Sequence, residues 1–367
     1  MYIIVSFIGL GNRFNQMKIL SGVLILLLLS IASIQCGKLT SSNQSNSDLP
    51  SNPSPVFTHH LTNLNNIKGI VPLGAVSDNT IAEKTYFFCK YDANGNPIKV
   101  PLYAPVDMKL VSMAYRISQN QDQYLLFFQV SKEVKIRLDH IDSPIQQIKD
   151  VGPSSPAPKD DTKTSKPKKE LTFKAGDLIG YTNGTNVGVW DFGVSNTTIE
   201  NQFVNMDRYR NSKIDFEELH ADCPYNYFAD SLRSQYEALF ALQTGVPYKG
   251  ATCRSASRDV KGALSGAWYL DKDPYGDFRE VLAIAADFNG EIRIAGLGNN
   301  DLIISPNPSP ATNPDDVKVN DEICYEGSGG GNFAYFKVLS NTQVNVAYGT
   351  GGCPATFPNS NTQIYVR

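Results

Sequence analysis

Side chains that could catalyse a reaction or bind a metal are few in this sequence of 367 residues. It contains four histidines, and their positions do not allow a Ser-His-Asp arrangement to be nominated. The segment DKDPYGD (271–277) begins like a calcium-binding loop, but Tyr275 takes a ligand position and Leu282 stands where a bidentate glutamate is needed. A turn is therefore expected there. The segment EGSGGGN (326–332) lacks the lysine of a phosphate-binding loop and is expected to connect two strands.

The six cysteines indicate an oxidising compartment rather than redox or zinc chemistry, because no C-x-x-C motif occurs. Apart from the cysteine near the N-terminus, the simplest proposal pairs Cys223 with Cys253 and Cys324 with Cys353. Four cysteines allow three connectivities, so the pairing stays open at this point. Cys89, in the apolar run TYFFC, is expected to be a buried free thiol.

The first 36 residues resemble a bacterial lipoprotein signal peptide, with Met17 as a second candidate for the start. After Met17 come one lysine, an apolar run from Ile19 to Ile34, and Cys36. The run is shorter than the roughly 20 residues of a membrane-spanning helix and suits the apolar region of a signal peptide. Acylation of Cys36 would anchor the protein to a membrane. An ordinary secreted protein and an uncleaved anchor are the alternatives.

The chain after Cys36 divides by composition and pattern. Residues 37–56 are rich in serine, asparagine and proline and are expected to form a disordered tether. Residues 57–198 alternate apolar and polar side chains as strands do, and they are interrupted at 149–170 by a polar, proline- and lysine-rich insertion expected to be disordered.

The second half of the chain is expected to begin with a helical connector, residues 199–260. Its segment 228–247 has apolar residues at helical spacing and predicts one amphipathic helix, capped by Asp230 or Ser231. From residue 261 to 367 strand patterns return, with hairpins predicted at 281–297 and 332–349. The sequence therefore predicts a mainly β protein with one connecting helix and a C-terminal antiparallel sheet or barrel.

Composition excludes some classes of protein. Hydrophobic residues make up 41% of the chain, enough for a true core, so global disorder is excluded. The net charge of −3 argues against a nucleic-acid-binding protein, which would carry a basic excess.

Four segments resemble the M23, or LytM-type, family of zinc endopeptidases. They are LYAPVD (102–107), IRLDHID (136–142), FKAGDLIGYT (173–182) and VGVWDFGV (187–194), within residues 65–198. The resemblance implies an antiparallel β-sheet domain over residues 57–198. It also implies two histidines and one aspartate on Zn²⁺, with two further histidines that handle protons.

Most of these functional positions are changed in this sequence. The resemblance aligns Thr85 and Cys89 with the first ligand pair and Val189 with a proton-handling histidine. Only His140 and Asp191 remain as relics, so no zinc or other cofactor is expected. His140 is either a relic lining the old groove or a structural histidine, and the structural role is favoured. Trp190, alone in its strand, is expected to fill the groove rather than to line it.

The sequence thus predicts an envelope lipoprotein, facing the periplasm or the cell surface, with a peptidase-like scaffold that has lost its metal. Its partners would be the membrane and a ligand such as peptidoglycan or an envelope protein, bound by strand addition or in the groove. An active murein or peptide hydrolase with an atypical site around His140, Asp191 and Cys89 is the alternative, and only that alternative involves zinc. A purely structural spacer is the third hypothesis.

Overall fold

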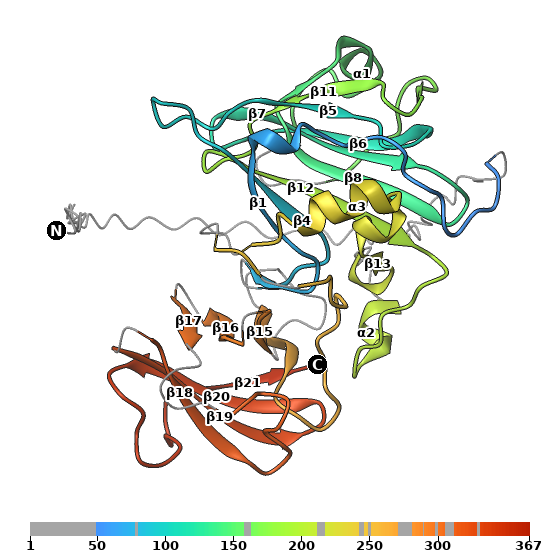
Figure 1. Cartoon of the computed structure of the whole chain (residues 1–367). Coiled ribbons are helices and arrows are strands. Elements are labelled where there is room, and N and C mark those ends of the chain that lie inside the picture. Colours follow the sequence, from blue (N-terminus) through green and yellow to red (C-terminus); the bar gives the residue numbers. More distant parts are fainter. Residues whose placement is uncertain are drawn as a thin grey trace, which may run out of the picture. The chain divides into compact units, whose positions relative to one another are not determined.

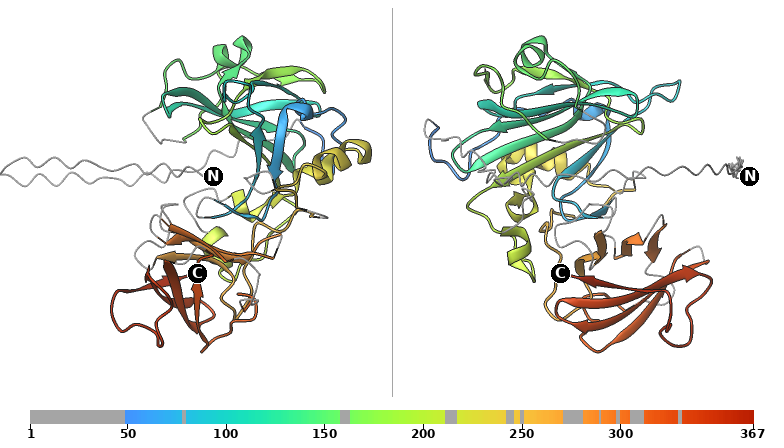
Figure 2. Two further views of the ribbon diagram at one scale, coloured as in Figure 1. Left: turned by 60° about the vertical axis from the view of Figure 1, so that its left-hand side comes forward. Right: turned by 180° about the vertical axis from the view of Figure 1, so that it is seen from behind.

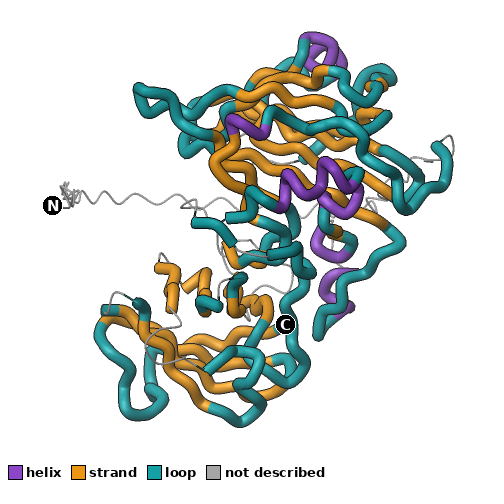
Figure 3. Tube along the Cα trace, viewed as in Figure 1, coloured by secondary structure: helices purple, strands orange, loops and turns teal. Residues whose placement is uncertain are grey.

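The computed structural model describes residues 49–77, 80–157, 163–210, 217–241, 246–248, 251–270, 281–288, 290–297, 300–304, 312–328 and 331–367. The expected signal peptide, Cys36, the start of the tether and the segment DKDPYGD lie outside these residues. The described chain is mainly β, as predicted, and its sheets are antiparallel (Figures 1 and 3).

The first half of the chain forms a large antiparallel sheet in which β12 lies between β4 and β8. The strand order is β1-β4-β12-β8-β7-β6-β10, and β13 pairs with β12 as well. The strands are β1 (Ile67–Val71), β4 (Thr85–Cys89), β6 (Met108–Ser118), β7 (Gln121–Gln129), β8 (Val134–Ile141), β10 (Thr172–Phe173), β12 (Val189–Asn196) and β13 (Ala221–Asp222).

Two smaller sheets accompany it. One has the order β5-β11-β9 and the other pairs β2 with β3. Their strands are β2 (Val76–Ser77), β3 (Thr80–Ile81), β5 (Val100–Tyr103), β9 (Ser143–Pro144) and β11 (Leu178–Thr182).

The last third of the chain is a curved eight-stranded antiparallel sheet of order β17-β16-β15-β14-β21-β20-β19-β18 (Figure 2). Both predicted hairpins are confirmed, as β15–β16 and β19–β20. The strands are β14 (Gly266–Leu270), β15 (Val281–Ala286), β16 (Ile292–Leu297), β17 (Asn300–Ile304), β18 (Glu322–Glu326), β19 (Asn332–Ser340), β20 (Gln343–Thr350) and β21 (Thr362–Val366).

This sheet has its own apolar core around Trp268, which is fully buried. The Arg367 guanidinium stacks over the Trp268 ring at 4.0 Å and donates to the carbonyl oxygens of Ser265 and Ala263. Arg367, which follows β21, is thereby bonded to the residues that precede β14, the strand that pairs with β21.

The expected helix over 228–247 is wrong in its length and its cap. α3 (Asp230–Glu237) is only eight residues long, and its N-cap is Ala229, which makes no side-chain cap. The helix ends because the next residues bond to β1: the Leu239 carbonyl accepts from the Ile70 amide at 2.8 Å, and the Ala241 amide donates to the Ile70 carbonyl at 2.9 Å. An open sheet edge competes with helix formation for these backbone groups.

The other helices are short. They are η1 (Leu64–Asn66), α1 (Gln146–Val151), α2 (Met206–Arg210), η2 (Glu217–Leu219) and η3 (Pro224–Tyr227). The expected connector at 199–260 is therefore several short turns and loops rather than one helix. Among the described residues, no helix is both long and apolar enough to cross a bilayer.

Parts of the insertion at 149–170 are ordered along the edge of β6, contrary to the expectation of disorder. The Ser165 amide donates to the Met113 carbonyl at 2.8 Å, and the Met113 amide donates to the Ser165 carbonyl at 2.9 Å. The Ala157 amide donates to the Tyr115 carbonyl at 2.7 Å. β6 has eleven residues while its neighbour β10 has two, so the insertion satisfies backbone groups that β10 leaves exposed.

The end of the expected tether is also held in place. Ser51 Oγ and the Asn52 amide donate to the two carboxylate oxygens of Glu133, at 2.6 and 2.8 Å, and Ser131 Oγ donates to the Asn52 carbonyl at 2.6 Å. Residues 49–56 therefore dock on the turn between β7 and β8. Composition alone predicted otherwise, because it does not reveal that this turn offers partners to a polar segment.

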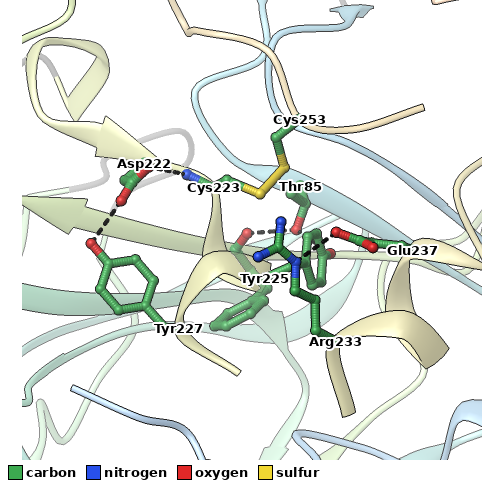
Figure 4. Close-up of a disulfide and its surroundings, with 9 residues drawn as sticks. Thr85, Asp222, Cys223, Tyr225, Tyr227, Arg233, Glu237 and Cys253 are labelled. Atoms are coloured by element: carbon green, nitrogen blue, oxygen red, sulfur yellow. Dashed lines mark hydrogen bonds and ion pairs between the residues drawn. A yellow bond between two sulfur atoms is a disulfide. The ribbon is translucent and has the colours of Figure 1, made fainter. Parts of the chain in front are cut away.

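Both predicted disulfides are present, Cys223–Cys253 and Cys324–Cys353, with Cα atoms 5.7 and 5.9 Å apart. The first joins the residue before η3 to the loop that leads to β14 (Figure 4). Cys89 is a buried free thiol, as expected.

Candidate functional site: a buried charged cluster on β4, β8 and β12

The strand order brings together Asp191 and His140, the two site residues that the sequence analysis retained. Asp191 of β12 pairs with Tyr86 of β4 on one side and with Asp139 of β8 on the other. His140 follows Asp139, and its Nε2 atom lies 3.8 Å from Asp191 Oδ2. A cross-strand neighbourhood of this kind places side chains within reach of one another.

Basic side chains fill the space around these carboxylates. Asp139 receives Arg116 Nη2 on Oδ1 at 2.7 Å and Arg137 Nη2 on Oδ2 at 3.2 Å. Lys84 Nζ lies 3.6 Å from Asp191 Oδ2. We refer to these residues together with Glu83 as the charged cluster: Glu83, Lys84, Arg116, Arg137, Asp139, His140 and Asp191.

Glu83 completes the charge balance of the cluster. Its Oε1 accepts from Lys84 at 2.7 Å and lies 3.4 Å from Arg137 Nη1. Three acids thus face three permanent cations. Asp139 and Asp191 are 3% and 2% exposed, so neither could stay charged at low cost without these partners.

The opposing effects of burial and of the neighbouring charges are reflected in the pKa values of Asp139, Glu83 and Lys84. Burial alone would raise the pKa of Asp139, but His140, Arg137 and Arg116 outweigh it and hold that pKa well below its usual range. Burial opposes ionisation of Glu83 in the same way, yet Lys84 and Arg137 lower its pKa. Burial and Arg137 disfavour the charged form of Lys84, but Glu83, Tyr86 and Asp191 raise its pKa above the ordinary value. Glu83, Lys84 and Asp139 are therefore ionised at neutral pH.

His140 is fixed by its backbone as much as by its ring. Its φ of 61° is in the left-handed region, where its amide donates to Asp139 Oδ1 at 2.7 Å and its carbonyl accepts from Thr182 Oγ1 at 2.7 Å. The ring Nδ1 bonds Gln123 Oε1 at 2.8 Å. An amide oxygen only accepts, so Nδ1 carries the hydrogen and Nε2 is the nitrogen that faces Asp191.

The ligand atoms do not fit a catalytic zinc ion. Asp139, His140 and Asp191 place one ligand atom each within 4.8 Å of one another, the one such group among the described residues. However, both Asp139 oxygens are already bonded to guanidinium groups, and Lys84 adds a further cation beside Asp191. Two ligands remain where three are needed, and three fixed positive charges oppose a dication.

The other two residues that the resemblance aligned with ligands lie on the opposite face of β4. Thr85 Oγ1 donates to the Phe192 carbonyl at 2.8 Å and accepts from Tyr225 at 3.0 Å. Side chains alternate along a strand, so Lys84 and Tyr86 share the face of Asp191 while Thr85 and Cys89 do not. Thr85 and Cys89 therefore cannot join the charged cluster.

That opposite face is an apolar core. Trp190 is fully buried and stacks on Phe87 with ring centroids 4.3 Å apart, so it fills space as expected. Burial raises the pKa of Cys89 to about 12, which keeps it a thiol and removes it from the atypical hydrolase site considered above.

The remaining histidines serve local contacts. His59 Nδ1 bonds the His60 carbonyl, His60 Nδ1 lies 3.4 Å from Tyr236 Oη, and His220 Nδ1 bonds the Ile199 carbonyl. The cations of the cluster and Gln123 belong to no motif that the sequence predicts. The available signal was the presence of arginine inside the strand patterns of 108–118 and 134–141.

No family model, no curated protein and no solved structure matches this chain. The resemblance to M23 endopeptidases therefore depends on the four quoted segments.

Proposed function

We propose that this protein is an exported component of a bacterial cell envelope, anchored through an acylated Cys36, that binds a partner on a metal-free peptidase-like scaffold. The observation that carries the proposal is the charged cluster. It surrounds His140 and Asp191, the two positions that the resemblance retains, and its cations supply positive charge beside their carboxylate neighbours without a metal.

Two further observations support export and the scaffold. Two disulfides are expected of a protein that folds in an oxidising compartment. Two of the four segments that resemble the M23 pattern lie on the paired strands β8 and β12, and the other two lie mainly on β5 and β11, which pair in a smaller sheet. The candidate partners are peptidoglycan and an envelope protein.

The test is incubation of the purified mature protein with murein and with oligoglycine peptides, with and without a chelator, together with the zinc content after dialysis. We expect no cleavage and no stoichiometric zinc, but capture of the protein by murein or by an envelope extract. Stoichiometric zinc that survives dialysis would contradict the proposal.

One observation favours a second candidate, an atypical hydrolase: His140 Nε2 and Asp191 Oδ2, on the two positions that the resemblance retains, lie 3.8 Å apart. Chelator-sensitive cleavage that disappears in His140→Ala would establish this candidate in place of the binding protein.

A further inference from the structure

A pocket of about 780 Å³ lies away from the charged cluster. Its walls come from the docked segment 53–56, the end of β12 and the residues after it, and the chain from β13 through η3 to the start of α3. Nothing in the resemblance to M23 endopeptidases accounts for it. We infer that this pocket binds a ligand that carries a protonated amine on an alkyl chain.

The floor of the pocket is fixed by buried polar groups. The Tyr227 hydroxyl donates to Asp222 Oδ2 at 2.7 Å, and Asn196 Nδ2 donates to the Tyr227 hydroxyl and to the Pro53 carbonyl, both at 2.8 Å (Figure 4 shows the first of these bonds). Asn196 and Tyr227 are 3% and 5% exposed. Burial and Asp222 raise the pKa of Tyr227, so the phenol remains a donor. The pocket is therefore preformed, which lowers the entropic cost of binding.

The charge of the lining is negative. Among the described residues, Asp222 and Asp230 line the pocket, while no lysine, arginine or histidine does. Asp222 accepts one bond on each oxygen, from the Cys223 amide and from Tyr227, and a carboxylate can accept about four. An ammonium group both complements this charge and supplies the missing donors.

The apolar part of the lining selects the rest of the ligand. Val56 is 57% exposed and lines the pocket together with Ile199, so an alkyl chain would bury surface there. A sugar is less suited, because the Tyr227 and Phe228 side chains are buried and pack against Phe57, so they expose little ring surface for stacking.

This inference deepens the proposed binding function and rests on it, since it assigns that function a site and a ligand class. The probe is 1,5-diaminopentane, titrated by calorimetry into the mature protein at low ionic strength. We expect saturable binding, weakened roughly tenfold by Asp222→Asn and by Asp230→Asn, because each removes one charge-assisted contact. Val56→Ser should weaken it severalfold.

Asp150→Asn is the matched control, since it removes an equal charge from an exposed residue of α1, outside the pocket lining, and should leave binding unchanged. Asp230 is exposed, so its variant tests the inference even where Asp222→Asn impairs folding. Equal weakening in Asp150→Asn, no saturation at millimolar amine, or preferential binding of calcium or N-acetylglucosamine would overturn the inference. Murein capture is measured separately on the same variants, so failure of the proposed function is distinguishable from failure of this one.

Discussion

Asp139 carries the largest share of the interactions within the charged cluster, because two guanidinium groups and one backbone amide bond its two oxygens. Replacing Asp139 by asparagine should leave Arg116 without its buried counter-charge and should remove one of the two carboxylates beside Arg137. We expect a loss of about 3–5 kcal/mol in the free energy of unfolding at pH 7, measured by urea denaturation. Asp150→Asn, at an exposed position, should change stability by less than about 0.5 kcal/mol.

The same residue predicts a pH dependence. The pKa of Asp139 in the folded protein is below that of an unfolded aspartate, about 3.9. Its contribution is therefore fully present above the unfolded pKa and is lost as the pH falls towards the folded one. The stability gap between the wild type and Asp139→Asn should narrow as the pH is lowered from 5 towards 3. A gap that stays constant over this range would show that Asp139 does not act through its charge.

At this scale the sequence identified His140 and Asp191 but not what surrounds them. Which residues of β4 face Asp191 depends on the strand register, and a shift of one residue moves every side chain to the other face. Thr85 and Cys89, which the resemblance aligns with metal ligands, face away from Asp191, while Lys84, between Glu83 and Thr85, reaches it. A local pattern does not contain that register.

At the scale of elements, local signals predicted the hairpins β15–β16 and β19–β20 well, because turn chemistry and alternation lie within the same short segment. The helix at 228–247, the insertion at 149–170 and the tether were predicted less well. In each case the chain bonds a distant strand or turn, such as Ile70 on β1 or Met113 on β6, whose open backbone groups a local analysis does not see.

The insertion can be tested through one of these bonds. Ser165→Pro removes the amide that donates to the Met113 carbonyl at 2.8 Å and should cost about 1–3 kcal/mol of stability. It should also promote association, because the edge of β6 becomes open to other strands. Ser165→Ala keeps both backbone bonds and should behave like the wild type in urea denaturation and light scattering. Equal behaviour of the two variants would show that the insertion does not protect this edge.

The two disulfides join elements that are close in sequence and give a second test. Cys223, Cys253, Cys324 and Cys353 should resist alkylation in the native protein without reductant. Replacing both cysteines of either pair by serine should cost about 2–5 kcal/mol. Buried Cys89 should resist alkylation until the protein is unfolded. Modification of four thiols in the native exported protein would show that the pairs are not formed there.

For the whole molecule, the docking of residues 49–56 limits how far the protein could stand from a membrane. The first bond of the docked segment is from the Lys132 amide to the Pro50 carbonyl, and 50 − 36 leaves 14 residue steps from Cys36. At about 3.3–3.6 Å for each extended residue, that distance is at most about 50 Å. If the protein is anchored through Cys36, its folded part can therefore stand less far from the bilayer than it could if the whole segment 37–56 were a free tether.

The anchor itself is tested by metabolic labelling. Cells that produce the protein should incorporate labelled palmitate into it, because a signal peptide ending at Cys36 would make that cysteine the acylated residue of the mature chain. Cys36→Ala should abolish the label and release the protein from the membrane fraction, while the disulfides and the urea denaturation midpoint stay unchanged. Cys89→Ala is the control, since that thiol is buried within the folded chain and should not affect labelling. Label that persists in Cys36→Ala would mean that the protein is held in the envelope by other means, and the 50 Å limit would no longer apply.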